Sequence, residues 1–268
     1  MAHPSKHIAL SIILPAYNEQ DRLPPYLTSI TRYLSQRGDS YEILVVDDGS
    51  RDGTAQRVRQ FAVDAPAVRL LRFPGNLGKG AAVRAGMLAA HGTLRLMADA
   101  DGATPIQEIE RLEHALTEGT DLAIGSRFLG SRDRRYQVQA RWHRTVLGNA
   151  FNRIAQQLGL EGITDTQCGF KLFRKRVAED LFFVARIDGY GFDLELLYVA
   201  RRRNYRIAEV PINWTDQPGS KVRVVRDGLR MFRELLAVRR HAAQGLYRRR
   251  ESADVLQELR HAAESRRY

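Results

Sequence analysis

Residues 41–54 read YEILVVDDGSRDGT. The first part, Tyr41–Val46, is short, mostly apolar and rich in β-branched residues, which predicts a buried strand. Two aspartates, a glycine and a serine follow at once, and the pattern over residues 53–64 then predicts a helix. A strand followed by a polar turn and a helix is the unit from which parallel sheets are built, so this stretch favours an α/β fold.

The same succession recurs on both sides of this stretch. Helical patterns over 20–36, 78–91 and 105–118 separate four further apolar runs that predict strands, at Ile8–Leu14, Val68–Arg72, Thr93–Ala98 and Asp121–Gly125. Strands that are apolar on both faces indicate a mostly parallel sheet covered by helices on both sides. Ligands bind beyond the carboxyl ends of the strands in such sheets, so the residues that follow each strand are the candidates for a site.

The second half of the chain is less regular. Its patterns predict a strand at Phe170–Phe173, an edge strand at Arg206–Val210, and helices over 139–158, Asp193–Arg203 and Val224–Tyr247. The last helix is amphipathic, with arginines between an apolar stripe formed by Leu229, Phe232, Leu236 and Leu246. We expect an α/β domain over residues 1–222 and a basic amphipathic helical extension over 223–268.

Length and composition exclude several classes of protein. With 268 residues, 44% of them hydrophobic, the chain can bury a core and is not disordered as a whole. A single cysteine, Cys168, excludes a disulfide framework and a cysteine-based zinc site, and it is expected to be a buried packing residue. No apolar stretch reaches the roughly 18 residues that a membrane-spanning helix needs, so a cytoplasmic protein is expected.

The net charge of +11 is concentrated near the end of the chain. Residues 201–250 hold fourteen Lys and Arg against four Asp and Glu. This excess predicts an anionic partner: nucleic acid, phosphates or an anionic membrane. The chain lacks a recognised nucleic-acid motif, so no nucleic-acid partner is expected. A peripheral position on the inner face of the cell membrane, held by the basic helix, is favoured instead.

Acidic residues follow two of the predicted strands. Asp99 and Asp101 come directly after the strand that ends at Ala98, and two carboxylates at this spacing can share Mg²⁺ or Mn²⁺ with a diphosphate. Asp47 ends its strand at the position where acids bind a base or ribose in nucleotide-binding folds, although a turn and a helix cap would explain the same residues. Residues Gly75–Gly80 form a glycine-rich entry to a helix, where Lys79 can approach a phosphate. This loop is neither a P-loop nor a dinucleotide-binding fingerprint.

Taken together, these motifs resemble family 2 nucleotide-sugar glycosyltransferases with a GT-A, Rossmann-like fold. The resemblance rests on Pro-Ala-Tyr-Asn-Glu, Val-Val-Asp-Asp-Gly-Ser-x-Asp-Gly-Thr, Asn-x-Gly-Lys-Gly and Asp-x-Asp, which occur in family order within residues 8–101. Further stretches at 98–105, 125–127 and 164–171 are similar to dolichyl-phosphate β-glucosyltransferases and, more distantly, to dolichyl-phosphate mannose synthases. The resemblance extends over about residues 8–235.

The resemblance implies a role for each matching residue. The residues implied to bind the nucleoside are Pro15, Tyr17, Glu19 and Asp47. Those implied to bind the metal and the diphosphate are Asp99 and Asp101. Donor diphosphate or acceptor phosphate is expected to meet Arg127, Lys171 and Lys221. The chain departs from the pattern in two ways: Ala103 stands where mannose synthases commonly have a metal-binding Gln, and the hydrophobic membrane segments of many relatives are missing.

The implied reaction is an inverting transfer of a hexose, glucose from UDP-glucose, to a polyprenyl or dolichyl phosphate. Such a phosphate is already ionised near neutral pH, so no strong general base is needed. A hydroxyl acceptor remains the alternative, and it would need a carboxylate to take its proton. Asp165 is then the first candidate, with Asp193 or Glu195 in reserve, although ion pairing with arginines would also account for all three.

Trp142 and Trp214 could frame an acceptor pocket or simply pack in the core. A purely nucleic-acid-binding or membrane-binding protein is the non-enzymatic alternative.

Overall fold

The computed structural model describes residues 7–139, 156, 160–217 and 224–248, with the side chains of 224–232 excepted. The first five strands lie close to where the sequence predicts them: β1 (Leu10–Ala16), β2 (Tyr41–Asp47), β3 (Val68–Arg72), β4 (Leu94–Ala98) and β5 (Leu122–Ser126). The helices that follow them are α1 (Leu23–Arg37), α2 (Thr54–Asp64), α3 (Lys79–Ala89) and α4 (Ile109–Thr117), with a 3₁₀ turn, η1 (Ile106–Glu108), before α4. Prolines at the start of α1 and a left-handed Gly38 at its end fix the limits of that helix.

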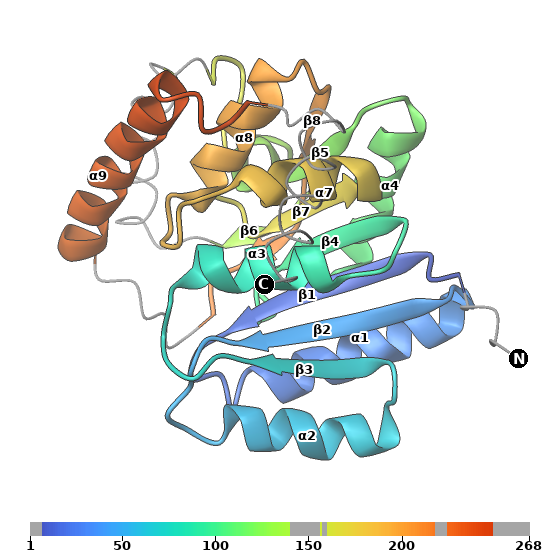
Figure 1. Cartoon of the computed structure of the whole chain (residues 1–268). Helices are drawn as coiled ribbons and strands as arrows, with labels where there is room; N and C mark the ends of the chain where they lie inside the picture. Colours follow the sequence, from blue (N-terminus) through green and yellow to red (C-terminus); the bar gives the residue numbers. More distant parts are fainter. Residues whose placement is uncertain (1–6, 140–155, 157–159, 218–223, 249–268) are drawn as a thin grey trace, which may run out of the picture.

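A seven-stranded sheet forms the centre of the molecule (Figure 1), in the order β3-β2-β1-β4-β7-β5-β8. Six of its strands run parallel. The exception is β7 (Phe170–Arg174), which lies between β4 and β5 and is antiparallel to both. The edge strand β8 (Ile207–Pro211) pairs with β5 in parallel, and a separate small sheet joins β6 (Val138–Gln139) to β9 (Trp214–Thr215). The expected α/β fold with a mostly parallel central sheet is confirmed.

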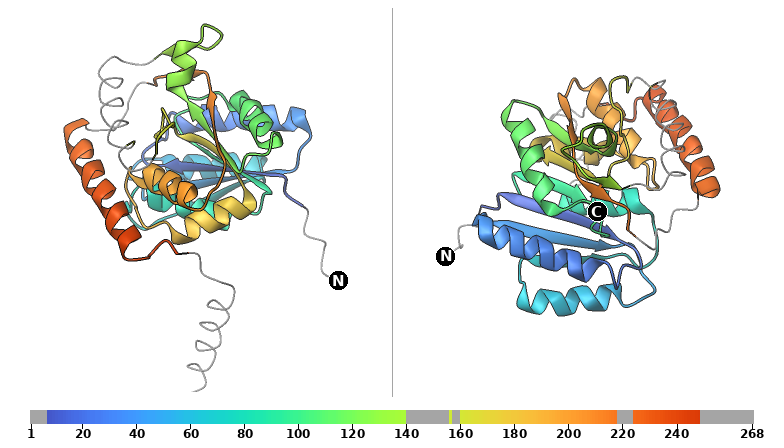
Figure 2. Two further views of the ribbon diagram at one scale, coloured as in Figure 1. Left: turned by 90° about the horizontal axis from the view of Figure 1, so that it is seen from above. Right: turned by 180° about the vertical axis from the view of Figure 1, so that it is seen from behind.

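Helices cover both faces of the sheet (Figure 2). On one face, Ile12, Leu14 and Ile43 pack against α1, α2 and α4. On the other, Ile13, Leu44 and Phe173 pack against α3, α7 (Lys175–Val184) and α8 (Phe192–Arg202). The short helix α5 (Arg127–Arg132) and α7 have no counterpart in the expected elements. The helix expected over 139–158 lies almost entirely outside the described residues.

The helix expected at Val224–Tyr247 is present as α9 (Val224–Ala243). It buries Leu235 and Val238 in the same core cluster as α8, while Leu236, expected on the apolar stripe, is 52% exposed. Each buried side chain of this size contributes about 1.5–3 kcal/mol, so these contacts hold the described part of α9 against the core that it shares with α8. No helix in the described part of the chain is long and apolar enough to span a membrane.

Candidate functional site

The sheet brings several predicted site residues to one edge. The carboxyl ends of β1, β2 and β4 lie side by side because these strands are parallel. The antiparallel β7 starts at the same edge, and there the backbone N–H of Asp99 donates to the carbonyl of Gly169 at 2.9 Å. Loop 164–169 is thereby placed beside the acidic residues that follow β4, although it is about seventy residues away in the sequence.

Asp99 sits between a lysine and a glycine. The Lys79 ammonium, from the first turn of α3, lies 2.5 Å from Asp99 Oδ1. A Cβ atom at Gly169 would overlap the Asp99 carboxylate, so only glycine leaves room for the carboxylate at this place. Burial opposes the charge on Lys79, but the carboxylates of Asp99 and Asp193 outweigh it and raise the lysine pKa. Lys79 is therefore held as a cation against the acidic residues.

Asp101 belongs to a second charged group at the same edge. Its Oδ1 accepts the N–H of Ala103 at 3.1 Å, and its Oδ2 lies 3.9 Å from a guanidinium nitrogen of Arg22. Arg22 is in turn fixed by Glu19, whose Oε2 accepts its Nε–H at 2.7 Å. Burial and the neighbouring Asp99 raise the pKa of Asp101. Glu19 thus positions Arg22 beside Asp101. Sequence reasoning missed Arg22, whose only signal was its three-residue spacing from Glu19.

The two aspartates suit a hard divalent cation only with help from a ligand. In the described residues, no three Asp, Glu, His or Cys side chains stand close enough together to hold a metal ion. Asp99 Oδ1, however, is buried, and the Lys79 ammonium 2.5 Å away does not satisfy it with a hydrogen bond of good geometry. Oxygen ligands of this kind are what Mg²⁺ and Mn²⁺ prefer, and diphosphate oxygens commonly complete their shells. The donor set therefore fits such a cation, with the substrate supplying the remaining ligands.

The acids after β2 have separate partners. Asp48 accepts the backbone N–H of Leu77 at 2.7 Å and of Gly78 at 3.0 Å, and so anchors the glycine-rich loop. Asp47 is fully buried: its Oδ1 accepts the Ser50 N–H, and its Oδ2 faces Arg72 at 3.1 Å. The turn after β2 lies close to the glycine-rich loop, and this needs a glycine at position 49. Gly49 has a φ of 68°, and a Cβ atom there would overlap the backbone of Gly75.

Pro15 and Tyr17, the other two residues expected to hold the nucleoside, lie at the carboxyl end of β1. Pro15 is paired in register with Val46 of β2, and Tyr17 follows directly after the strand. Both are partly exposed. They therefore lie at the same sheet edge as Asp47 and Asp99.

Arg127 and Asp165 form the most complete ion pair of the site. Asp165 Oδ2 accepts from the backbone N–H and the Nε–H of Arg127 at 2.9 and 2.8 Å, and Oδ1 accepts from its terminal nitrogen at 2.8 Å. Burial would raise the pKa of Asp165, but the Arg127 charge and hydrogen bonds lower it. Glu209 of β8 holds the loop by accepting the N–H of Asp165 at 2.8 Å. The indole ring of Trp214 lies 5.4 Å from the guanidinium carbon of Arg127, which gives Trp214 a partner at the site.

Lys171 lies beneath the site rather than at its surface. It is 0% exposed, and its ammonium contacts Asp193 Oδ1 at 2.5 Å and donates to the Cys168 carbonyl at 2.7 Å. This placement does not match the expected contact with a phosphate, because no part of the side chain reaches the surface. Cys168 is buried, and burial raises the pKa of its thiol to about 12, which agrees with a packing role. Lys221 and Trp142 lie outside the described residues.

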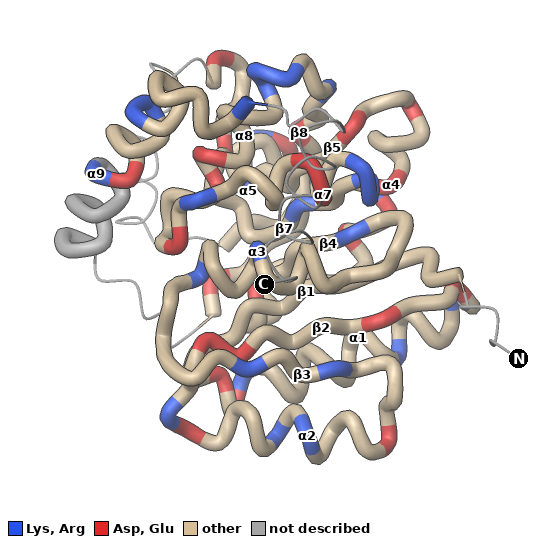
Figure 3. Tube along the Cα trace, viewed as in Figure 1, with Lys and Arg blue, Asp and Glu red and all other residues tan. Residues whose placement is uncertain are grey.

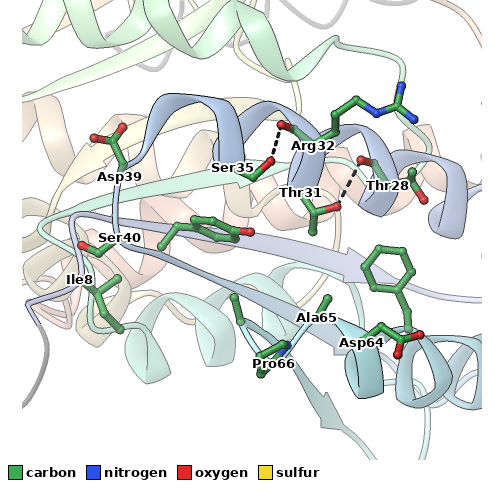
Figure 4. A pocket seen from close by; sticks show the side chains of 13 residues that line it. Ile8, Thr28, Thr31, Arg32, Ser35, Asp39, Ser40, Asp64, Ala65 and Pro66 are labelled. Atoms are coloured by element: carbon green, nitrogen blue, oxygen red, sulfur yellow. Dashed lines mark hydrogen bonds between the residues drawn. The ribbon is translucent and has the colours of Figure 1, made fainter.

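A large open pocket lies elsewhere on the molecule (Figure 4). It measures about 1020 Å³ and lies between α1 and the end of α2, near the amino ends of the strands. The hydroxyls of Thr31 and Ser35 that line it donate to carbonyls of their own helix. None of the residues expected to form the site lines this pocket.

Two solved structures align with this chain over most of its length. Glucosyl-3-phosphoglycerate synthase from Mycobacterium tuberculosis, in complex with Mn²⁺ and UDP-glucose, aligns with a TM-score of 0.64 at 21% identity, over 91% of this chain and 81% of that one. Mannosyl-3-phosphoglycerate synthase from Rubrobacter xylanophilus aligns with a TM-score of 0.65 at 20% identity, over 91% and 78%. At this level of identity the likeness establishes the fold, and the expected GT-A architecture is confirmed.

Similarity in sequence extends over nearly the whole chain. The dolichyl-phosphate β-glucosyltransferase of Dictyostelium discoideum is 38% identical over 259 residues, covering 92% of this chain and 78% of that protein. The human dolichyl-phosphate β-glucosyltransferase is 36% identical over 250 residues, covering 89% and 77%. The family model described as glycosyl transferase family 2 matches residues 11–182. The chain is therefore a member of glycosyl transferase family 2.

Proposed function

We propose that the protein transfers glucose from UDP-glucose, with inversion, to a polyprenyl phosphate such as dolichyl phosphate. The observation that carries this proposal is identity of 36–38% over about nine tenths of the chain to enzymes named for that reaction. The site adds chemical support, because Asp99 and Asp101 stand at the sheet edge together with the cations Lys79, Arg22 and Arg127.

Different residues at the sheet edge would bind different parts of the donor. The partly exposed Pro15 and Tyr17 lie where the nucleoside would bind. The buried Asp47 would act there by holding Ser50 and Arg72, as Glu19 acts by holding Arg22. The diphosphate would lie by Asp99 and Asp101, which would hold Mg²⁺ or Mn²⁺, and by Lys79. When bound, the cation would neutralise charge that develops on the departing diphosphate. Lys221 would add a positive charge for a phosphate.

The acceptor chemistry follows from what Asp165 already does. Both of its oxygens accept hydrogen bonds from Arg127, and its pKa is lowered, so it is a poor choice for a general base. A phosphate acceptor does not need one, because its attacking oxygen is already ionised. We therefore assign Asp165 to positioning Arg127, whose guanidinium would meet the acceptor phosphate or the leaving diphosphate.

The proposal is tested with radiolabelled UDP-glucose and a matched pair of acceptors, a polyprenyl phosphate and the corresponding polyprenol. Transfer to the phosphate is expected to be at least about 10²-fold faster than transfer to the alcohol. The alcohol must lose a proton, and the lack of a general base slows such a reaction on that scale. GDP-mannose serves as the donor control and should give little product. Equal or faster transfer to the alcohol would instead favour the second candidate function, glycosylation of a hydroxyl.

The outer face of α9 is proposed to rest on an anionic bilayer at the inner face of the cell membrane. Arg233, Leu236 and Arg240 are exposed along this face, opposite the buried Leu235 and Val238. In Figure 3, blue segments that mark Lys and Arg occur along the described part of α9. Such a position would bring the site to a lipid substrate. Anionic lipids attract each nearby basic residue by about 1 kcal/mol.

Reversing both charges, Arg233→Glu with Arg240→Glu, is expected to weaken binding to phosphatidylserine-containing vesicles about thirtyfold or more, since two contributions of that size are lost. Co-sedimentation over a salt series measures the effect, and binding of the unaltered protein should weaken as salt increases. The matched control reverses Arg57 and Arg59, which are exposed on α2. If this control lost binding equally, the contact would be a diffuse charge effect and not a property of α9.

A further inference from the structure

The loop between α7 and α8, residues 185–191, is held at both ends by carboxylates. Near its start, the backbone N–H groups of Arg186 and Ile187 donate to Glu195 at 2.9–3.0 Å. At its end, the N–H of Gly191 donates to Glu234 Oε2 at 2.7 Å. Buried backbone donors need such partners, so these two carboxylates fix the path of the loop.

Both carboxylates depend on the C-terminal part of the chain. Glu234 itself belongs to α9. Glu195 belongs to α8 and is fully buried, but its Oε1 accepts the hydroxyl of Tyr247, which follows α9, at 2.6 Å. The C-terminal segment therefore reaches the loop at two points, one direct and one through Glu195.

Two glycines leave the space that the Glu234 side chain occupies. A Cβ atom at Gly189 would overlap the Glu234 carboxylate, and one at Gly191 would lie 2.8 Å from Oε2 and from Cβ of Glu234. Neither glycine has a positive φ, so the backbone at Gly189 would accept alanine, and the cost of its methyl group would be displacement of the Glu234 carboxylate. Gly191 also precedes the first residue of α8, where a negative charge is stabilised by the exposed N–H groups and the helix dipole.

The opposite side of the loop holds the start of α3. The carbonyl of Asp188 accepts the N–H of Gly80 at 2.7 Å and of Ala81 at 3.3 Å. Gly80 is next to Lys79, whose ammonium faces Asp99. A continuous set of contacts thus runs from Glu234 on α9, through loop 185–191 and the first turn of α3, to Asp99.

From this set of contacts we infer that Glu234 is a positioning residue for the donor site. It acts through loop 185–191, which places Lys79 against Asp99. The same helix presents Arg233 and Arg240 outward, so a contact of α9 with any surface bears directly on this loop. The inference rests on the proposed function only in taking Lys79 and Asp99 as the place where the UDP diphosphate binds.

The test measures binding of UDP in the presence of Mn²⁺ by titration calorimetry, with the full-length protein well below its unfolding temperature. Glu234→Ala is expected to raise the dissociation constant about tenfold, the scale of one hydrogen bond to a charged group. Glu234→Gln keeps an acceptor oxygen and should recover most of the affinity. Glu118→Gln, at an exposed residue after α4, is the matched control and should change nothing.

Gly189→Ala supplies a second route that leaves Glu234 in the chain. Its methyl group displaces the carboxylate, so it should weaken UDP binding as Glu234→Ala does, and combining the two should cost no more than either alone. This variant also decides the matter if Glu234→Ala does not fold. A lowered melting temperature with unchanged UDP affinity in both variants would overturn the inference. Failure of the unaltered protein to bind UDP would instead count against the proposed function.

Discussion

Replacing Asp101 by asparagine is expected to lower kcat for glucosyl transfer about a thousandfold, because stabilisation of the departing diphosphate by a bound cation is worth several kcal/mol. Asparagine can still accept the N–H of Ala103, so the turn after β4 should persist and the melting temperature should change little. Asp101→Ala removes that contact as well and should be equally inactive. Steady-state kinetics with Mn²⁺ and thermal unfolding measure the two effects.

The matched control is Asp64→Asn, an exposed aspartate at the end of α2. It makes the same change of charge far from the sheet edge and should leave kcat unaltered. Activity of the unaltered protein should also disappear in excess chelator and return with Mg²⁺ or Mn²⁺. Full activity in the chelator, or in the asparagine variant, would refute the assignment of Asp99 and Asp101 to a cation.

The sequence pattern was sufficient for the strands that carry these acids. Short apolar runs separated by helical patterns are a local property, and β1 to β5 lie within a few residues of their expected limits. The pairing order is not local. Nothing in the pattern of Phe170–Phe173 indicated that it enters the sheet between β4 and β5 in the opposite direction, which is what places Gly169 beside Asp99.

Side-chain partners within the site were harder to foresee than its acids. Lys171 was expected at a phosphate because it is basic and lies in a matching motif. In the structure its ammonium is buried and forms an ion pair with the buried Asp193. Arg22 was missed because it lies three residues after an acid, just before α1, in a spacing that many surface arginines share. On α9, leucines occupy adjacent positions, and only packing against α8 decides that Leu235 is buried and Leu236 exposed.

Replacing Arg127 by methionine is expected to lower kcat with a polyprenyl phosphate roughly 10²–10³-fold, the scale of losing one preorganised donor to a developing charge. Methionine keeps much of the apolar stem that lies near Trp214. The change also leaves Asp165 buried without its cation, so the melting temperature should fall. Asp165→Asn should cost less, because asparagine can keep part of the contact with Arg127.

The double variant separates two roles for Asp165. If Asp165 acts only by holding Arg127, then Asp165→Asn should have almost no further effect on kcat once Arg127 is methionine, and it should recover stability by removing the unpaired charge. A general base would behave differently: its loss would multiply that of Arg127, by on the order of 10²-fold, and would flatten the acid limb of the pH–rate profile. Since Asp165 has a lowered pKa and accepts three hydrogen bonds from Arg127, we expect the non-additive result.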